Sequence, residues 1–297
     1  DVERSRGLGD VYKRQDLLHA PQLTEHDLQS QQHRVKELQA KLADMEQTPA
    51  VRDLMSVADH LLRRSVWIIG GDGWAYDIGS GGVDHVLASG RDVNVLVLDT
   101  EVYSNTGGQA SKSTPLGAVA KFASAGKPTA KKDMALQAIA YGSVYVARVA
   151  LGADPQQTLR AFREAEAYPG PSLIIAYSHC IAHGYDLRNG LDQQYKAVHC
   201  GHWPLMRYNP VLADEGRNPF LLDSPKPDET WREYTKLELR YRMLQKAHPE
   251  EAERMLDLGQ RQVERRYAEY AEMASRTAED FAVDARMSEF AASSNRA

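Results

Sequence analysis

The segment 65–109 places the tightest limit on the fold of this chain, because it contains two apolar runs that each end in a polar turn. The first run, residues 65–69, leads into the turn GGDG at 70–73. A helix-length segment then leads to the second run, residues 93–98, which ends in the turn DTEVYSNT at 99–106. Such apolar runs are typical of strands buried on both faces of a parallel sheet. Ligands bind beyond the carboxyl ends of these strands, so both turns are candidates for a binding site.

The oxygen donors of the two turns suit a magnesium ion that holds a diphosphate. The glycines of the first turn let the backbone approach an anion closely. Asp72 is a hard carboxylate donor, and Thr100 in the second turn offers a hydroxyl. The Val102 carbonyl and the Asn105 amide add further oxygens. Mg²⁺ takes about six oxygens, with one or two commonly from protein carboxylates and others from phosphates and water, which these turns can supply.

Strands and helices continue to alternate after this segment. A strand is predicted at 144–149, and Asp154 followed by Pro155 is a typical helix start. Another buried strand is predicted at 172–177. The alternation predicts an α/β fold with a doubly wound, mostly parallel sheet.

We expect the chain to be organised in four parts. They are a non-native or disordered tail at 1–15, a helical lead-in at 16–64, a cofactor-binding domain at 65–223 and a helical extension at 224–297 with a disordered end. Residues 202–224 are interrupted by prolines and are expected to run extended over the surface. Residues 227–247 and 249–273 are expected to form two long helices whose apolar stripes are packing surfaces.

Composition excludes several classes of protein. The net charge of −5 argues against binding to nucleic acid or to a membrane surface. No apolar run approaches the ~20 residues that span a bilayer, and no signal peptide opens the chain. Two cysteines in 297 residues indicate a reducing compartment, so we expect a cytoplasmic protein.

The strings GGDGWAYDIG at 70–79 and LDTEVYSNTGGQ at 98–109 resemble thiamine-diphosphate enzymes of one branch, the pyruvate:ferredoxin (flavodoxin) oxidoreductases. The resemblance covers about residues 51–223. It implies that Mg²⁺ is held by Asp72, Thr100 and the Val102 carbonyl, and that Asn105 contacts the substrate or the thiamine. The residues implied to surround the cofactor are Gly71, Asp72, Gly73, Trp74, Thr100, Glu101, Val102, Tyr103, Ser104 and Asn105.

Cys180 follows the strand predicted at 172–177 and therefore shares a sheet edge with Asp72 and Thr100. In the family that the chain resembles, this position is the distant fourth ligand of a [4Fe–4S] cluster, which needs four thiolates in all. The other three would come from a missing upstream portion, and Cys200 is interpreted as structural. Zinc is a weaker alternative, because the flanking histidines and two sulfurs fit a closed zinc site poorly: His179, His183, His199 and His202.

The resemblance implies oxidative decarboxylation of pyruvate to acetyl-CoA and CO2, with coenzyme A as co-substrate. Electrons would leave through iron–sulfur clusters to ferredoxin or flavodoxin. The implied partners are the remainder of the polypeptide and a second copy in a homodimer. As the C-terminal part of such an enzyme, this chain is expected to be inactive alone. Lys112, Lys121 and Lys127 are interpreted as surface lysines in preference to residues that steer coenzyme A or an anionic substrate.

Three alternative functions stay open at this point. The first is a 2-oxo-acid oxidoreductase that acts on 2-oxoglutarate or an aryl pyruvate. The second is a non-redox thiamine-dependent decarboxylase, which would keep the metal turns without needing Cys180. The third is an assembly module that keeps the fold without a cofactor.

Overall fold

A computed structural model describes residues 14–22 and 24–281 of the chain. It divides into two compact units between Ser65 and Val66. The predicted tail at 1–15 lies outside the described residues except for Arg14 and Gln15, and so does the predicted disordered end beyond residue 281. Within the described part, no helix combines the length and the apolar character that crossing a membrane requires.

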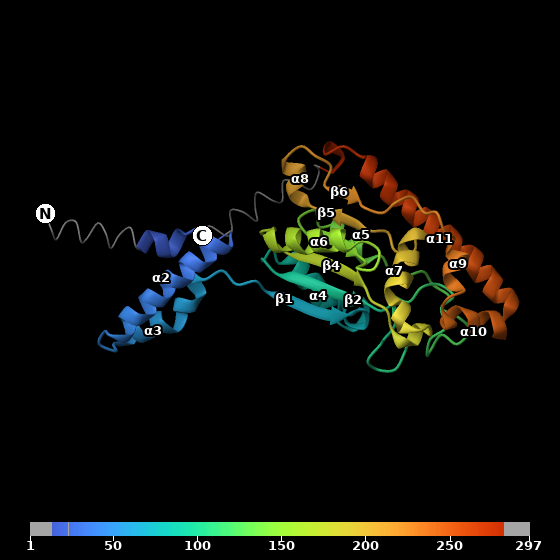
Figure 1. Cartoon of the computed structure of the whole chain (residues 1–297), viewed down its shortest axis with the longest axis horizontal. Coiled ribbons are helices and arrows are strands. Elements are labelled where there is room, and N and C mark those ends of the chain that lie inside the picture. Colours follow the sequence, from blue (N-terminus) through green and yellow to red (C-terminus); the bar gives the residue numbers. More distant parts are fainter. Residues whose placement is uncertain (1–13, 23, 282–297) are drawn as a thin grey trace. The chain divides into compact units, whose positions relative to one another are not determined.

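The first unit is helical, with α2 (Glu25–Ala43), α3 (Pro49–Val57) and the 3₁₀ turn η1 (Ala58–Leu61), drawn in blue in Figure 1. The helix α2 begins with a capping box, in which the Thr24 hydroxyl accepts from the Asp27 amide and the Asp27 carboxylate accepts from the Thr24 amide. Two backbone N–H groups that lack a partner within the helix are thereby satisfied, which favours the start of α2 at this point.

The second unit is built on one six-stranded sheet of order β1-β2-β4-β3-β5-β6. Its first four strands in this order are parallel, and β5 and β6 are antiparallel additions. The strands are β1 (Trp67–Gly71), β2 (Asn94–Asp99), β3 (Tyr145–Val149), β4 (Ser172–Tyr177), β5 (Met206–Tyr208) and β6 (Phe220–Leu222). The predicted α/β class with a mostly parallel sheet is confirmed.

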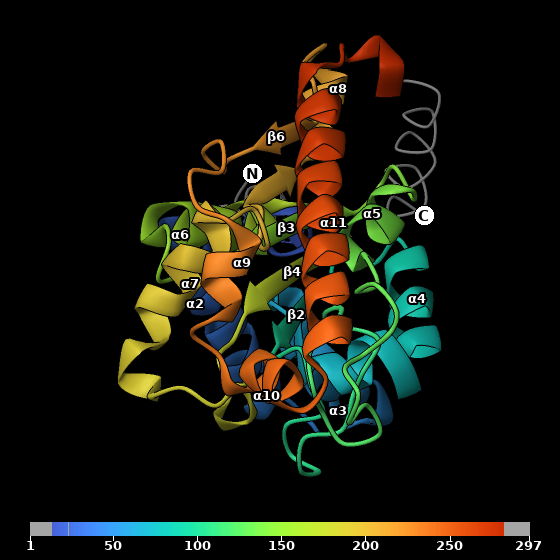
Figure 2. The same ribbon diagram turned by 90° about the vertical axis from the view of Figure 1, so that its right-hand side faces the viewer.

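Helices pack against both faces of this sheet. The buried residues Ala161 and Ala165 of α6 (Pro155–Ala167) pack on one face, against Tyr145 and Ile174. The opposite face is covered by α4 (Ser80–Ala88), α5 (Met134–Ile139) and the long α11 (Pro249–Ser275), which crosses in front of the sheet in Figure 2. The other described helical elements are the π-helix η2 (Gly73–Ile78), η3 (Ile181–His183), η4 (Leu187–Asn189), α7 (Gly190–His199), α8 (Pro210–Asp214), α9 (Trp231–Thr235), α10 (Leu239–Ala247) and η5 (Glu279–Phe281).

The prediction that residues 202–224 run extended over the surface was wrong. This segment supplies β5 and β6, and β5 is fully buried. Its central residue is Arg207, whose guanidinium forms ion pairs with Glu164 and Asp223. Because the middle residue of this three-residue strand is charged, the sequence shows no apolar run that would predict a buried strand. The ion pairs of Arg207 offset the cost of burying its charge.

The single long helix predicted at 227–247 is also wrong, because the chain forms two short helices, α9 and α10. They are separated at Glu238, which has an extended backbone and a fully buried carboxylate. That carboxylate accepts hydrogen bonds from Arg240 and Gln193. The side chain is therefore directed inward, and the helix is interrupted at this residue.

Candidate cofactor site

The strand order places three turns next to one another at the carboxyl edge of the sheet. The register pairs Gly71 of β1 with Leu98 of β2, and Asp99 of β2 with Tyr177 of β4. The turns that follow β1, β2 and β4 therefore start at the same height and lie side by side. This is the edge at which open α/β sheets bind ligands.

The structure brings together the three predicted magnesium ligands. The Thr100 hydroxyl lies 2.8 Å from Oδ1 of Asp72 and 3.0 Å from the Val102 carbonyl oxygen. The other carboxylate oxygen of Asp72, Oδ2, accepts a hydrogen bond of 2.7 Å from the Ser111 hydroxyl. Ser111 comes from the loop after the second turn and was not predicted. Its place in a run of small polar residues, ASKST, carries no signal that separates it from its neighbours.

Asp72 is a buried carboxylate with hydroxyl donors but no cation. Its side chain is 1% exposed, and within the described residues no Lys, Arg or His nitrogen forms an ion pair with it. Burial and the nearby charge of Asp99 raise the pKa of Asp72 to about 6. A buried carboxylate that forms no ion pair and lies beside a hydroxyl and a carbonyl oxygen is a suitable set of ligands for a hard divalent cation such as Mg²⁺. The described residues form no cluster of three or more His, Cys, Asp or Glu.

Aromatic rings lock the first turn in place. A Cβ atom on Gly70 would lie 2.3 Å from the Trp74 ring, and one on Gly73 would lie 2.4 Å from the Tyr103 ring. These contacts require glycine at both positions. Trp74 therefore packs onto its own turn, and Tyr103 ties the second turn to the first.

Glu101 faces away from the other predicted cofactor residues. Its side chain is fully buried, and its oxygens lie 2.8 Å from His202 Nε2, 2.7 Å from Arg240 Nη2 and 3.3 Å from Lys131 Nζ. Burial raises the pKa of Glu101, but the hydrogen-bonded contact with His202 and the charges of Lys131 and Arg240 outweigh burial and hold that pKa well below its usual value. Burial lowers the pKa of His202 itself, so the positive charge beside Glu101 comes from Lys131 and Arg240. The backbone of Glu101 remains at the turn, whereas its carboxylate is neutralised inside the protein.

Asp99, the last residue of β2, belongs to the same buried polar cluster, because Lys131 contacts both Asp99 and Glu101. Its carboxylate accepts from the Tyr76 hydroxyl at 2.8 Å and from Lys131 Nζ at 2.8 Å, and it also binds the Ser113 hydroxyl. The sequence did not predict the pairing of Lys131 with Asp99, because a lysine in a polar segment such as KKD at 131–133 is usually exposed. The sequence feature that could have indicated a buried cation was Asp99, because a carboxylate at the end of a buried apolar strand needs a partner.

Ser104 and Asn105 are exposed at the tip of the second turn. The Ser104 hydroxyl lies 3.2 Å from the sulfur of Cys180, which follows β4 and is 7% exposed. Cys180 thus adjoins the second turn. Cys200 is buried elsewhere, and burial raises the pKa of its thiol to about 12.

The histidines near the two cysteines do not converge. His183 Nε2 pairs with the Thr100 carbonyl, His199 Nδ1 with Asp228, and His202 Nε2 with Glu101. Burial, together with the charge of Arg240, lowers the pKa of His183 to about 4. The described part of the chain therefore offers no zinc cluster.

The interpretation of the three lysines as surface residues fails for Lys127. It is 8% exposed, and its Nζ donates to the Thr114 carbonyl. Burial lowers its pKa to about 8. Lys112 is exposed and pairs with Asp77, and Lys121 is exposed beside the second turn.

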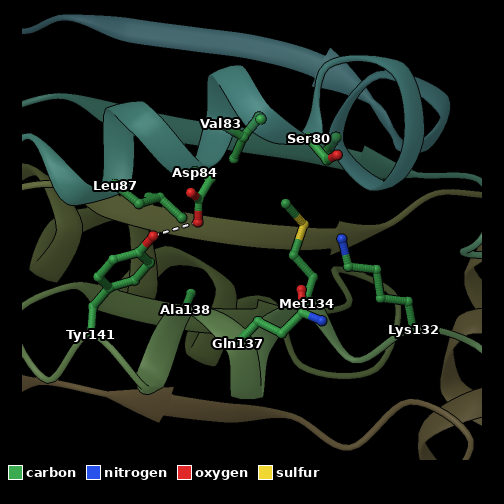
Figure 3. Close-up of a pocket in the computed structure, with 11 residues that line it drawn as sticks. Ser80, Val83, Asp84, Leu87, Lys132, Met134, Gln137, Ala138 and Tyr141 are labelled. Atoms are coloured by element: carbon green, nitrogen blue, oxygen red, sulfur yellow. Dashed lines mark hydrogen bonds between the residues drawn. The ribbon is translucent and has the colours of Figure 1, made fainter.

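Two cavities of similar size lie in the second unit. One of about 260 Å³ adjoins the second turn and is lined by residues that include Val102, Gly108, Lys121 and Arg240. The other, of about 240 Å³, lies between α4 and α5 and contains none of the predicted site residues (Figure 3). In it Tyr141 donates a hydrogen bond to Asp84 across the gap between these helices.

The fold and the paired turns define a thiamine-diphosphate-binding domain. The family "Thiamine pyrophosphate enzyme, C-terminal TPP binding domain" matches residues 54–176, which include Asp72, Thr100 and Val102.

Full-length relatives narrow the assignment. The chain is 55% identical over 262 residues to a putative pyruvate-flavodoxin oxidoreductase of Synechocystis sp., covering 88% of this chain and 22% of the relative. It is 54% identical over 265 residues to a pyruvate-flavodoxin oxidoreductase of Nostoc sp., covering 88% and 22%. It is 55% identical over 222 residues to a pyruvate:ferredoxin oxidoreductase of Moorella thermoacetica, covering 75% and 19%.

A solved 2-oxoglutarate:ferredoxin oxidoreductase from Magnetococcus marinus, with 2-oxoglutarate, coenzyme A and succinyl-CoA bound, matches 38% of this chain and 40% of that chain. The TM-score is 0.36 and the identity 25%.

Over most of its length the chain is homologous to pyruvate-flavodoxin and pyruvate:ferredoxin oxidoreductases, and it spans about a fifth of the length of the curated relatives that it matches.

Proposed function

We propose that this chain holds the magnesium–thiamine diphosphate centre of an enzyme that oxidatively decarboxylates pyruvate. Pyruvate and coenzyme A would give acetyl-CoA, CO2, a proton and two electrons, and the electrons would pass through iron–sulfur clusters to ferredoxin or flavodoxin. The observation that carries this proposal is the buried carboxylate of Asp72, which lies 2.8 Å from the Thr100 hydroxyl and forms no ion pair with any side chain in the described part of the chain. The names of the relatives support the choice of pyruvate and of the acceptor.

Asp72, Thr100 and the Val102 carbonyl would bind the magnesium ion. Ser111 holds Oδ2 of Asp72 and so leaves Oδ1 directed toward Thr100. The backbone of Gly71 and of residues 101–104 would surround the diphosphate, together with Gly73 and Trp74. Thiamine diphosphate, when bound, supplies the carbanion chemistry that removes CO2 from a 2-oxo acid. Asn105, exposed at the tip of the second turn, is the proposed contact to the substrate or the thiamine.

Cys180 would supply one thiolate to a [4Fe–4S] cluster. Four thiolates are needed, so the other three would come from polypeptide beyond this chain. Its contact with Ser104 at 3.2 Å would put the cluster next to the cofactor turn, where electrons are released. Pairing with a second copy of the polypeptide is part of the same proposal.

Calorimetric titration of thiamine diphosphate into the complete polypeptide, with and without Mg²⁺, tests the proposal. We expect binding that depends on Mg²⁺. Binding that is absent, or that ignores Mg²⁺, would support a cofactor-free assembly module instead.

The reaction itself is tested by dye reduction that requires both pyruvate and coenzyme A. Faster reduction with 2-oxoglutarate or phenylpyruvate would reassign the substrate within the same chemistry. The variant Cys180→Ser should lose the electron paramagnetic resonance signal of the proximal cluster, and an intact signal would remove Cys180 from the ligand set.

A further inference from the structure

The helix α10 contacts all of the loops that build the carboxyl edge beyond the first turn. The Val119 amide, in the loop that contains Ser111, donates to the Arg240 carbonyl at 2.9 Å. Gly184, just after Cys180 and with φ +76°, approaches so closely that a Cβ atom there would lie 2.3 Å from Leu239. Figure 2 shows α10 beside these loops at the lower end of the sheet.

The helix α10 also forms an ion pair with Glu101, through Arg240. Glu101 lies between two proposed magnesium ligands, Thr100 and Val102. Glu101 has a φ of +57°, which is uncommon for a residue with a side chain. Its backbone is held on both sides, because its amide donates to Asp99 Oδ1 at 3.0 Å and its carbonyl accepts from Thr114. Such a backbone persists only where its surroundings over-determine it.

Arg240 of α10 is one of the residues that surround Glu101, and it lies 139 positions further along the chain. Its Nη2 lies 2.7 Å from Glu101 Oε2, and its Nε pairs with Glu238. Glu238 also accepts from Gln193 at 2.9 Å and from the Tyr234 hydroxyl at 2.9 Å. All three charged residues are buried, so the link between α10 and the second turn is shielded from water.

We propose that Arg240 is a positioning residue for the magnesium site and acts through Glu101. The left-handed backbone at Glu101 directs the Thr100 hydroxyl and the Val102 carbonyl to one point, where they lie 3.0 Å apart. Arg240 holds that conformation from outside residues 54–176, the range of the family match. The inference rests on the proposed function, because the ligands that it positions are the proposed ones.

The test uses Arg240→Gln and Arg240→Lys in the complete polypeptide, with Arg207→Gln as a matched control. Arg207 is likewise a buried arginine that bridges two carboxylates, but it lies on β5 among Glu164 and Asp223. The measurements are the dissociation constant of Mg²⁺ at saturating thiamine diphosphate, the midpoint of urea unfolding, and kcat at saturating Mg²⁺.

We expect Arg240→Gln to weaken Mg²⁺ binding by about 10- to 100-fold, the range usual for partners that orient metal ligands. Excess Mg²⁺ should restore most of kcat. Arg240→Lys reaches only one of the two carboxylates and should show a smaller loss. Arg207→Gln should lower the urea midpoint and leave the Mg²⁺ dissociation constant unchanged.

Each other result counts against the inference. If Arg240→Gln does not fold, Arg240→Lys decides, and an unchanged Mg²⁺ dissociation constant in the variant that folds overturns the positioning role. Equal weakening in Arg207→Gln would show that any loss of buried charge has this effect. If the unaltered polypeptide shows no Mg²⁺-dependent binding, the proposed function fails and this inference fails with it.

Discussion

Two buried carboxylates, Asp72 and Glu101, lie in neighbouring turns at the same edge of the sheet. They differ in whether positively charged side chains surround them. Glu101 is surrounded by Lys131, His202 and Arg240, so its charge is neutralised inside the protein. Within residues 14–22 and 24–281, Asp72 accepts hydrogen bonds from the hydroxyls of Thr100 and Ser111 and forms no ion pair. Because an ionised group without a partner is costly to bury, the comparison separates a carboxylate whose charge the fold itself balances from the one that we propose as a magnesium ligand.

The largest expected effect comes from Asp72→Asn. This change should abolish Mg²⁺-dependent binding of thiamine diphosphate, because it removes the charge that the ion requires. Without the ion, the same change should stabilise the protein at pH 7 by up to about 3 kcal/mol, since every tenfold weakening of an acid on folding corresponds to about 1.4 kcal/mol. Calorimetric titration and urea unfolding measure the two effects, and a destabilised apo-protein would contradict the comparison.

Glu101→Gln should act in the opposite direction on stability. Removing one partner from a buried ion-pair cluster costs about 3–5 kcal/mol, because the remaining charges stay buried without compensation. Urea unfolding of the apo-protein measures this loss. The control is Glu164→Gln, a half-buried partner of Arg207 that should cost less. Stability equal to that of the unaltered protein would show that Glu101 is not needed to balance its cations.

The raised pKa of Asp72 predicts how pH affects the site. The pKa is about 6 in the folded protein and 3.8 in the absence of burial, so ionising Asp72 costs stability as pH rises from 3.8 to 6. Mg²⁺ binds the ionised form, so its affinity should be constant well above pH 6 and about tenfold below that plateau at pH 5. Titrations of Mg²⁺ at several pH values measure this, and an affinity that is flat down to pH 5 would exclude Asp72 as a ligand.

The smallest expected effect is that of Ser111→Ala. The hydrogen bond from Ser111 favours the ionised form of Asp72, so its removal should raise the pKa of Asp72 further and weaken Mg²⁺ binding about fivefold, in line with roughly 1 kcal/mol for one hydrogen bond. Ser89→Ala removes an exposed hydroxyl that donates to Val86 and serves as the control. An unchanged affinity in Ser111→Ala would mean that Thr100 alone orients the carboxylate.

The sequence predicted the apolar strands and the turns that follow them, because both signals are local. β1 to β4 each contain a run of apolar residues, and Asp154 and Pro155 mark the start of α6. The proposed magnesium ligands were found for the same reason. Asp72 and Thr100 directly follow β1 and β2, and Val102 lies two residues beyond Thr100, where the strand order brings the turns together.

The buried charges could not be predicted in this way. Arg207, Lys127 and Arg240 look like surface residues in the sequence, and their burial depends on partners far away along the chain. Glu101 stays a predicted cofactor residue through its place in the second turn, but the sequence did not indicate that its side chain is buried among Lys131, His202 and Arg240. Local patterns reveal which segments form strands and turns, whereas the pairing of charges follows only from the folded topology.

The pairing of Glu101 with Arg240 joins residues 139 positions apart. During synthesis the second turn leaves the ribosome long before α10 does, so its backbone has no arginine to hold it in the left-handed conformation. The contact between Arg240 and Glu101 can therefore form only after α10 has been synthesised and has docked.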